Sequence, residues 1–281
     1  MISVIIPVYN EQSTIKACLL SLCRQSVKPR EIIVVDDGST DGTAEAVREF
    51  IRSNRDCSVK LRKTAHRGPG LARNFAAAKT RGTILVFADS DMTFEHKFLE
   101  KLTLPIKTGK SKGTFNTDEE VANWDKPLSR CWNYFGGLPG RNRIKAEYGQ
   151  VSPVFRAILK SEFLKSGGFT PIGYTDDWTL SRKLGYKADL AAGAKSYHYN
   201  PETFPEVYRQ ARWIGKNEFI SGTLLRRLFN LFRYSPLYQI PRSLILSVKY
   251  RQLLLIPFSA VYSLGVTVSV VKSFFRESKY K

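Results

Sequence analysis

The chain has 281 residues, of which 43% are hydrophobic and 12% aromatic, enough for one large domain or for one domain with an appendage. Its 44 Lys and Arg residues outnumber its 25 Asp and Glu residues and give a formal charge of +19. An excess of this size indicates binding to nucleic acid, to an anionic membrane surface or to phosphorylated substrates. The sequence repeats at no fixed period, which excludes a solenoid.

The basic residues are concentrated towards the carboxyl end. Residues 222–281 contain ten basic residues and one acid, so +9 of the +19 charge lies there. The four cysteines include no CxxC pair and no His partner at metal-ligand spacing, which favours reduced thiols in a cytosolic compartment. Because the first apolar run follows Met1 directly, without a signal peptide, we expect the main domain on the cytoplasmic side.

The first part of the chain alternates apolar runs with helical patterns. Runs at 3–7 and 31–35 predict strands, and each is followed by a loop and an amphipathic helix, the first capped by Ser13 and the second within 43–51. Two strand–loop–helix units in about 50 residues predict a right-handed, mostly parallel α/β arrangement. A further strand is predicted at 59–61.

The segment 83–91 carries the clearest functional signal. Its apolar run is too short for a helix and predicts a buried strand, which ends in Asp89-Ser90-Asp91. In open α/β sheets, ligands bind at the carboxyl edge of the strands. Two carboxylates one residue apart at that edge predict a hard divalent cation, completed by water and phosphate oxygens. The alternative is that Asp89 or Asp91 caps a helix that starts near Phe94.

Two other polar turns accompany these acids. Asp36-Asp37 follows the second predicted strand, and a Gly-rich turn at 66–74 leads into a helix with Arg73 in its first turns. Backbone N–H groups and Arg73 could cradle a phosphate there. Neither GxGxxG nor GxxxxGK[ST] occurs, which argues against a nicotinamide dehydrogenase and a P-loop NTPase. The alternative for both turns is structural, an Asx turn and an ordinary tight turn.

The second part of the chain is less regular. We interpret residues 107–148, which mix Gly, Lys, Arg and aromatic residues, as a variable insertion at the mouth of the site. Asp176-Asp177 open a predicted helix, with Trp178 and Leu184 as candidate core residues. The other predicted elements are a helix at 95–104, a strand at 154–159, a helix at 160–166, a strand at 188–192 and a helix at 206–219.

The tail indicates membrane contact. Residues 252–271 carry no charge and are just long enough to cross a hydrocarbon core, although Pro257 and Gly265 interrupt them. A single span, a re-entrant or interfacial arrangement and a soluble packing helix all remain open. Upstream, residues 224–233 interleave Leu and Phe with Arg, which is typical of a helix lying in the plane of an anionic membrane.

The order of these motifs resembles that of GT-A-fold glycosyltransferases of family 2, over residues 1 to about 220. The motifs are Pro7-x-Tyr9-Asn10-Glu11, Val35-Asp36-Asp37-Gly38-Ser39-x-Asp41, Gly70-x-Ala72-Arg73-Asn74, Asp89-Ser90-Asp91, Gly167-Gly168-Phe169 and Asp176-Asp177. The resemblance implies a Rossmann-like, mostly parallel sheet flanked by helices in a catalytic domain at 1–221. It also implies inverting transfer of a sugar from a nucleotide-sugar to an acceptor hydroxyl or phosphate, assisted by Mg²⁺ or Mn²⁺. The basic and apolar residues of the tail predict a membrane-associated helical segment at 222–281.

The same resemblance assigns roles position by position. Asp177 would be the general base, and Asp91, helped by Asp89, would hold the metal ion, with His198 as a candidate further ligand. The nucleotide-sugar would be bound by Pro7, Tyr9, Glu11, Asp37, Arg73, Asp89 and Ser90, and the acceptor or the diphosphate by Asp176, Arg212 and Trp213. A structural role is the alternative for His198, Arg212 and Trp213. Arg209 stands where processive polysaccharide synthases carry Gln, which argues against a chain-extruding synthase.

The expected partners are a UDP- or GDP-sugar, a membrane surface and a lipid-linked acceptor, such as a polyprenyl phosphate or a polyprenyl-linked saccharide. Transfer to a soluble or protein acceptor is the main alternative. A metal-dependent sugar nucleotidyltransferase, which would release diphosphate, and a catalytically inactive scaffold are others. We do not expect nucleic-acid binding, because the sequence contains no RNP-like aromatic pair, zinc-site spacing or recognition helix.

Overall fold

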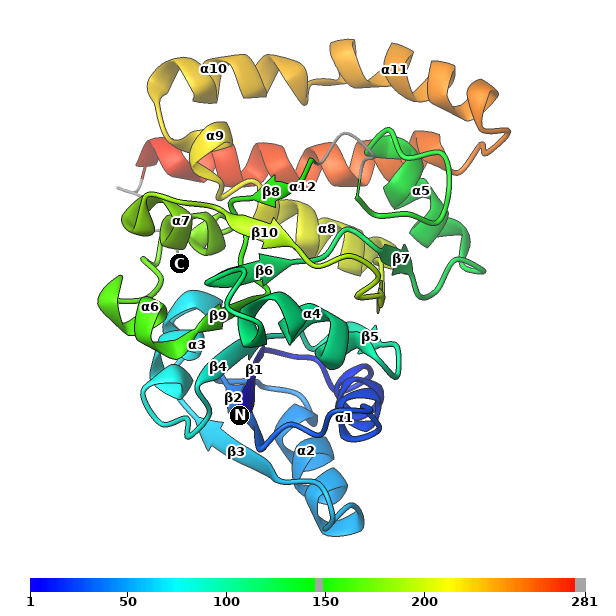
Figure 1. The fold of residues 1–281 in the computed structure, drawn as a ribbon. Coiled ribbons are helices and arrows are strands. Elements are labelled where there is room, and N and C mark those ends of the chain that lie inside the picture. Colours follow the sequence, from blue (N-terminus) through cyan, green and yellow to red (C-terminus); the bar gives the residue numbers. More distant parts are fainter. Residues whose placement is uncertain (145–148, 276–281) are drawn as a thin grey trace. The chain divides into compact units, whose positions relative to one another are not determined.

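The computed structural model describes residues 1–144 and 149–275 (Figure 1). The chain divides into two compact units. Unit 1 consists of residues 1–120, 144–171 and 176–198, and unit 2 of residues 121–143, 172–175 and 199–281. The domain boundary expected after residue 221 stays a prediction, and residues 276–281 of the predicted tail lie outside the described residues.

Unit 1 contains, among the described residues, an eight-stranded sheet. Its strands are β1 Ile2–Val8, β2 Glu31–Asp36, β3 Val59–Lys63, β4 Ile84–Phe87, β6 Gly113–Phe115, β8 Val151–Ser152, β9 Ala157–Leu159 and β10 Ala188–Leu190. They lie in the order β3-β2-β1-β4-β9-β6-β10-β8. The first four are parallel neighbours, and β9 runs antiparallel between β4 and β6. The expected α/β class with a mostly parallel sheet is confirmed.

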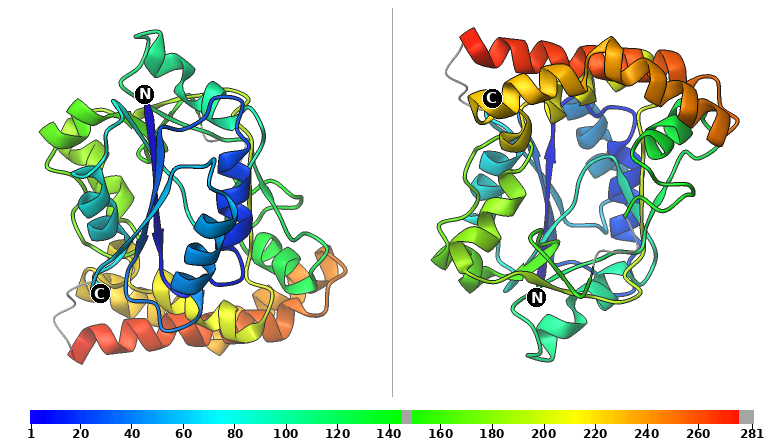
Figure 2. Two further views of the ribbon diagram at one scale, coloured as in Figure 1. Left: turned by 90° about the horizontal axis from the view of Figure 1, so that it is seen from below. Right: turned by 90° about the horizontal axis from the view of Figure 1, so that it is seen from above.

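Helices cover both faces of this sheet (Figure 2). One face carries α1 Ile15–Cys23, α2 Thr43–Ser53 and α4 Phe98–Lys107, and the other carries α3 Pro69–Ala77, α6 Lys160–Lys165 and α7 Thr179–Leu184. Successive side chains of a strand point to opposite faces, so β1 serves two cores. Val4 and Ile6 pack with α1 and α4, whereas Ile5 packs with α3.

Three expectations about unit 1 are corrected. Helix α4 begins at Phe98, because Met92–Phe94 form a strand, β5, that pairs with β11 Ser196–His198. The presumed insertion after residue 107 contains β6, which lies within the sheet between β9 and β10. This strand has only three residues, too few for a readable alternation. Helix α1 is preceded by Thr14 rather than capped by Ser13, and the Thr14 hydroxyl donates to Glu11.

The expectation of four reduced thiols is also corrected. Cys23, at the end of α1, and Cys57, just before β3, form a disulfide, with their Cα atoms 5.7 Å apart. This distance lies within the usual range for such a bond. The pairing depends on which loops meet in the fold, and a separation of 34 residues does not reveal that. Cys18 and Cys131 are free and buried.

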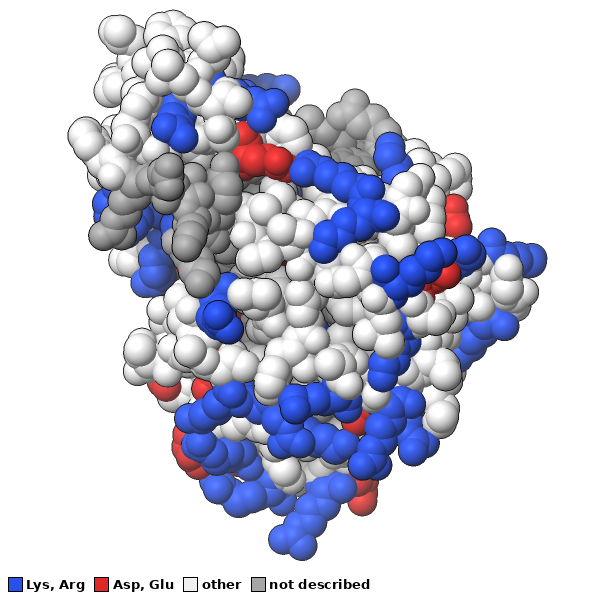
Figure 3. All heavy atoms as spheres, turned by 90° about the vertical axis from the view of Figure 1, so that its left-hand side faces the viewer, with Lys and Arg blue, Asp and Glu red and all other residues white. Residues whose placement is uncertain are grey.

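Positive charge also gathers on unit 1. Figure 3 shows Lys and Arg side chains crowded at the lower end of one face, the end at which Figure 1 places α2 and β3. Strand β3 itself contributes Lys60, Arg62 and Lys63. The basic surplus therefore occurs in unit 1 as well as in the tail.

Unit 2 is mainly helical. Its helices are α5 Pro127–Phe135, α8 Phe204–Ile214, α9 Glu218–Ser221, α10 Leu224–Arg233, α11 Pro236–Lys249 and α12 Leu255–Phe275. Helix α12 packs closely along α8, and Gly265 permits this approach because it has no side chain. A Cβ atom at this position would lie only 2.8 Å from the Ala211 Cβ. Among the described residues, α12 is the one helix that has the length and apolar composition needed to cross a membrane.

Candidate active site

The predicted acidic loops start from one edge of the sheet. The parallel register places Val8 beside Asp36, so β1 and β2 end together, and it places Phe87 beside Ile5, so β4 ends slightly earlier towards the same carboxyl edge. The loops after these strands carry Glu11, Asp37 and the Asp89-Ser90-Asp91 segment. This is the edge at which open α/β sheets bind ligands. Because α4 starts only at Phe98, with Lys97 before it, neither Asp89 nor Asp91 caps that helix.

Asp89 is held between two arginines. Arg73 Nη2 lies 2.8 Å from Asp89 Oδ1, and Arg156 Nη1 lies 2.7 Å from Asp89 Oδ2. Burial alone would raise the pKa of the Asp89 carboxyl, but Arg156 and Arg73 hold that pKa well below its usual range. Both of its oxygens are therefore engaged by cations. The geometry favours Asp91 over Asp89 as a metal ligand.

Arg73 joins this pair to the late acidic motif. Its Nη1 lies 3.4 Å from Asp176 Oδ1, and its guanidinium lies over the Phe169 ring at 5.7 Å. A Cβ atom at Gly70 would lie only 2.5 Å from Asp176 Oδ2, so this position needs glycine for the close approach. Three motifs that are far apart in the sequence thus meet in unit 1.

Asn74 fixes the loop on which Phe169 lies. Its Nδ2 donates to the Phe169 carbonyl at 2.8 Å, and its Oδ1 accepts from the Phe169 N–H at 2.9 Å. Gly168 has φ +75, and a Cβ atom there would lie 2.5 Å from Asn74 Oδ1. The Gly-Gly-Phe motif is therefore a tight loop that Asn74 clamps against α3.

Asp177 has a buried carboxylate oxygen, Oδ1, that is not hydrogen-bonded within the described residues. Burial raises the pKa of Asp177 to about 6, with Arg73 and Arg156 opposing the shift and Asp176 and Asp89 adding to it. A carboxylate of this kind is suited to accept a proton near neutral pH.

His198 lies between two carboxylates. Its Nε2 is 3.0 Å from Asp91 Oδ2, and its Nδ1 is 3.0 Å from Glu119 Oε1. A carboxylate that accepts from Nδ1–H fixes the tautomer and leaves the Nε2 lone pair for a metal ion. The sequence predicted Asp91 and His198 as candidate ligands, and the structure brings them together through the β5–β11 pairing.

This donor set fits a divalent cation held mainly by substrate and water. No group of three or more His, Cys, Asp or Glu side chains suited to a metal ion occurs in residues 1–144 or 149–275. One carboxylate oxygen and one imidazole nitrogen suit Mn²⁺ or Mg²⁺ when diphosphate oxygens complete the shell. Burial and the charge of Asp91 raise the pKa of the Glu11 carboxyl to about 7, so Glu11 adds only part of a negative charge near neutral pH.

Asp37 organises the turn before α3. Its carboxylate accepts from the backbone N–H groups of Arg67 and Gly68, at 3.0 and 2.8 Å, and from the Thr64 hydroxyl at 3.2 Å. His66 in the same turn stacks on Tyr9, with ring centroids 4.1 Å apart. The structure thus places Tyr9 and Asp37 around one turn, while their contact with a nucleotide stays a prediction.

The remaining predicted residues are placed separately. Pro7 is buried within β1, and Ser90 is buried between the two acids of its motif. Arg212 and Trp213 lie on α8 in unit 2, where the Arg212 guanidinium packs over Tyr208 and Lys216 packs over Trp213. Their role towards the acceptor or the diphosphate stays a prediction.

Sequence reasoning missed Arg156 and Glu119. Arg156 precedes β9 and reaches Asp89 because β9 runs antiparallel to β4, so that the Phe87 N–H donates to the Arg156 carbonyl. Glu119 opens β7 Glu119–Val121 and contacts both His198 and Arg156. The available signal was weak, because Arg156 is a single charge inside a short apolar run and Glu119 lies in a polar, acidic stretch.

Arg156→Met should destabilise the protein by about 3 kcal/mol, because it leaves Asp89 with one partner and removes a cation from Glu119. Methionine keeps most of the side-chain volume. The control is Arg48→Met, which breaks the exposed ion pair with Glu45 and should cost less than about 0.5 kcal/mol. Urea unfolding followed by circular dichroism measures both values, and equal losses would contradict the proposed support of Asp89.

The comparisons with known proteins bear on the same residues. Residues 3–165 match the family model described as Glycosyl transferase family 2. Glycosyltransferase AglE of Haloferax volcanii is 37% identical over 242 residues, which cover 82% of this chain and 78% of that protein. Three other relatives are matched over only 22%, 40% and 59% of their lengths.

Two solved structures share the fold. S. aureus TarS 1-349 in complex with UDP-GlcNAc aligns with a TM-score of 0.58 at 18% identity, covering 100% of this chain and 93% of that chain. The mannosyltransferase PcManGT from Pyrobaculum calidifontis, in complex with GDP-Man and Mn²⁺, aligns with a TM-score of 0.55 at 22% identity, covering 97% and 75%. At these identities the likeness concerns the fold alone.

Proposed function

We propose how this chain acts, from the premise that it belongs to glycosyltransferase family 2 and is a nucleotide-sugar glycosyltransferase. It requires a divalent cation, and it transfers the sugar to a lipid-linked acceptor at a membrane surface. One observation carries the proposal. At the carboxyl edge of the unit 1 sheet, Asp91 and His198 form a two-donor site. Asp177, a carboxylate suited to accept a proton, lies within electrostatic reach of Asp89 in the same motif as Asp91. The relatives support a transferase, and the donor set supports the cation.

The departure of the nucleoside diphosphate is the step that needs positive charge. When bound, Mn²⁺ or Mg²⁺ neutralises charge that develops on the diphosphate oxygens. In this chain, Asp91 and His198 would hold the cation, and Glu119 would keep the His198 ring in the required tautomer. Arg73 is locked by Asp89 and Asp176, so it supplies a fixed positive charge that needs no reorganisation during reaction.

The attack on the anomeric carbon needs a base only for some acceptors. If the acceptor is a hydroxyl, Asp177 would take its proton through the unpartnered Oδ1. If the acceptor is an ionised phosphate, no proton has to leave, and Asp177 would act only by position and charge. Direct attack on the side opposite the leaving diphosphate would invert the anomeric configuration.

The donor is proposed to be a UDP- or GDP-sugar. The TarS structure contains UDP-GlcNAc and the PcManGT structure contains GDP-Man, so both bases occur with this fold. The lipid-linked acceptor is favoured by unit 2, whose tail is basic and whose helices expose many large apolar side chains. A soluble acceptor and a sugar nucleotidyltransferase are the alternatives.

The proposal predicts that radiolabel from UDP-GlcNAc or GDP-mannose enters the organic phase. The protein is incubated with one labelled donor, a lipid extract of its source cells and Mn²⁺, and the mixture is extracted with chloroform and methanol. Label in the organic phase that disappears with EDTA supports both the cation and the lipid acceptor. Label confined to the aqueous phase with release of nucleoside diphosphate indicates a soluble acceptor. In a separate incubation with UTP or GTP and a sugar 1-phosphate, release of inorganic diphosphate indicates a nucleotidyltransferase.

A further inference from the structure

The helices of unit 2 are arranged with polar side chains inside and apolar side chains outside. Helices α10 and α11 follow one another along α12, as Figure 1 shows. The buried positions of α10 and α11 are polar: Asn230, Gln239, Ser243 and Ser247. Several strongly exposed positions are apolar, with Leu225 at 80%, Leu237 at 82% and Val248 at 78% exposure. This is the reverse of an ordinary water-facing helix.

The inner polar groups are satisfied within unit 2. Asn230 Nδ2 donates to the carbonyls of Ile220 and Arg226, at 3.1 and 2.8 Å, and Gln239 Nε2 donates to the Arg233 carbonyl at 2.8 Å. The hydroxyls of Ser243 and Ser247 donate to backbone carbonyls of α11. These four inner side chains are therefore hydrogen-bonded within unit 2, whereas the exposed apolar side chains on the outward faces would need another apolar environment.

The outward apolar residues form one stripe on each helix. On α10 they are Leu225, Leu228, Phe229 and Phe232, and on α11 they are Leu237, Ile240, Leu244, Ile245 and Val248. Their spacing of three and four residues keeps each set on one side of its helix. We call these two stripes the outer face. Each residue of the outer face is about half or more exposed.

The charge around the outer face indicates which kind of partner would cover it. Residues 222–275 contain seven basic residues and no acid. The exposed ones are Arg226, Arg233, Lys249, Arg251 and Lys272. A second copy of this chain would bring the same positive charge to the contact, which would repel it. An anionic lipid surface offers the opposite charge together with hydrocarbon.

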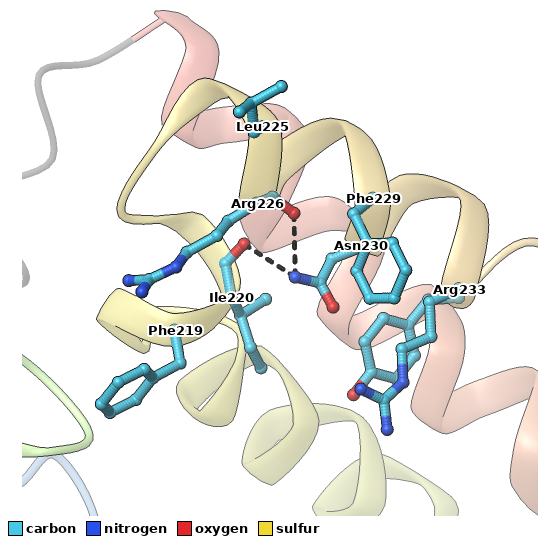
Figure 4. Close-up of a pocket in the computed structure, with 8 residues that line it drawn as sticks. Phe219, Ile220, Leu225, Arg226, Phe229, Asn230 and Arg233 are labelled. Carbon is cyan, nitrogen blue, oxygen red and sulfur yellow. Dashed lines mark hydrogen bonds between the residues drawn. The ribbon is translucent and has the colours of Figure 1, made fainter.

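A pocket on α10 fits the same partner. It has a volume of about 430 Å³ and is lined by Phe219, Ile220, Leu225, Arg226, Phe229, Asn230, Arg233 and Tyr234. Figure 4 shows the guanidinium groups of Arg226 and Arg233 at opposite ends of this row, with aromatic and aliphatic side chains between them. Such a site offers positive charge to the phosphate of a lipid and an apolar lining to the acyl chain of the same lipid.

Helix α12 lies beneath α10 and α11 in Figure 1 and is packed against α8. Its Gly265 lies against Ala211 of α8, a Cβ atom at Gly215 would lie 2.7 Å from the Ser269 Cβ, and the Ser269 hydroxyl donates to the Arg212 carbonyl. Buried residues along its length include Phe258, Val266 and Val270. These contacts would be lost if α12 left the unit to cross a bilayer.

We propose that the outer face of α10 and α11 lies in the plane of an anionic lipid surface, with α12 retained as its buried support rather than inserted as a span. This inference rests on the proposed membrane location and specifies how it is achieved. The apolar stripes would enter the interface while the arginines and lysines pair with lipid phosphates. Donor turnover by unit 1 is a separate property.

The test is binding of the whole protein to vesicles of phosphatidylcholine with and without phosphatidylglycerol. We expect sedimentation with the anionic vesicles, weakening with salt. Leu237→Glu with Ile245→Glu should weaken binding by roughly a hundredfold, because it puts two charges into the interface. Leu104→Glu with Leu164→Glu is the matched control, since these residues of α4 and α6 are 54% and 53% exposed and lie in unit 1.

Each other outcome opposes the proposal. Unchanged vesicle binding by the α11 variant, with its circular dichroism spectrum intact, would show that the outer face is not the contact. Retention in vesicles after alkaline carbonate extraction would indicate that α12 spans. A dimer in vesicle-free buffer that this variant dissociates would identify a second copy as the occupant. Hydrolysis of the nucleotide-sugar without acceptor, measured in parallel, separates failure of this inference from failure of the proposed function.

Discussion

Asp177→Asn is expected to lower the rate of transfer to a hydroxyl acceptor by about 10²–10⁴-fold while leaving donor affinity nearly unchanged. Asparagine keeps the size of the side chain but cannot accept the proton that, in the proposed reaction, the buried Oδ1 of Asp177 would receive. Transfer is measured with radiolabelled donor and affinity by calorimetry. Asp56→Asn, at an exposed position before β3, is the control and should change neither value. Full transfer by the Asp177 variant would reassign this residue.

The same carboxyl group should set the pH dependence. Burial raises the pKa of Asp177 to about 6, against the opposing effect of Arg73. A base acts only when deprotonated, so kcat/KM should fall about tenfold per pH unit below this pKa and level off above it. The groups that act on Asp177 are Arg73, Asp176, Asp89 and Arg156. The expected change between pH 5 and pH 8 is about tenfold. A flat profile over this range would indicate an acceptor that is already ionised.

Asp177→Asn should increase the stability of the folded protein although it lowers the rate of transfer. A carboxyl group whose pKa is raised on folding stabilises the folded state fully below its unfolded pKa of about 4, and that contribution is lost as the pH rises through about 6. Asparagine resembles the protonated form at every pH. Asp177→Asn should therefore raise the free energy of unfolding by about 1–2 kcal/mol near pH 7.5 and leave it nearly unchanged near pH 4.

Three strands of the parallel half, β1, β2 and β4, could be predicted because they are short, mainly apolar runs bounded by polar turns. Strands β1, β2 and β4 fall where the runs at 3–7, 31–35 and 83–87 indicate. The central position of β6 could not be predicted. Its three residues carry no period, and it enters the sheet only because β9 runs antiparallel and presents an edge to it.

The site shows the same division. Asp89, Asp91 and Asp177 could be singled out because acids in these motifs are uncommon at the ends of apolar runs and resemble a known order. Arg156 and Glu119 could not, since their importance depends on the antiparallel register of β9 and on the pairing of β5 with β11. The disulfide, and the arrangement of α10 and α11 with polar residues buried and apolar residues exposed, likewise depend on tertiary contacts. Sequence hydropathy alone cannot separate a span from a packed helix like α12.

Asp91→Ala is expected to lower cation-dependent turnover of the nucleotide-sugar by roughly a thousandfold, because it removes the carboxylate half of the two-donor site. The loss should be accompanied by weaker Mn²⁺ binding, measured by electron paramagnetic resonance of the free ion. His198→Ala should have an effect of similar direction. Turnover that remains full in Asp91→Ala would count against the site.

The partner of His198 provides a graded version of this test. Glu119→Gln keeps the shape of the side chain but weakens its hold on Nδ1, which lies 3.0 Å from Oε1. Mn²⁺ affinity should fall by about 10–100-fold, as expected for a residue that orients a ligand without touching the ion. Combining it with His198→Ala should add little further loss, because Glu119 acts through that ring. An additive loss would place Glu119 on the metal ion itself.

Asp89→Asn separates the two acids of the motif. Both Asp89 oxygens are engaged by Arg73 and Arg156, so its removal should leave two buried cations poorly paired and lower the free energy of unfolding by about 3 kcal/mol. Mn²⁺ affinity should change far less than in Asp91→Ala. The two variants would then differ in kind, one failing in cation binding and the other in stability. Equal losses of Mn²⁺ affinity would mean that Asp89 leaves its arginines to join the cation when donor binds.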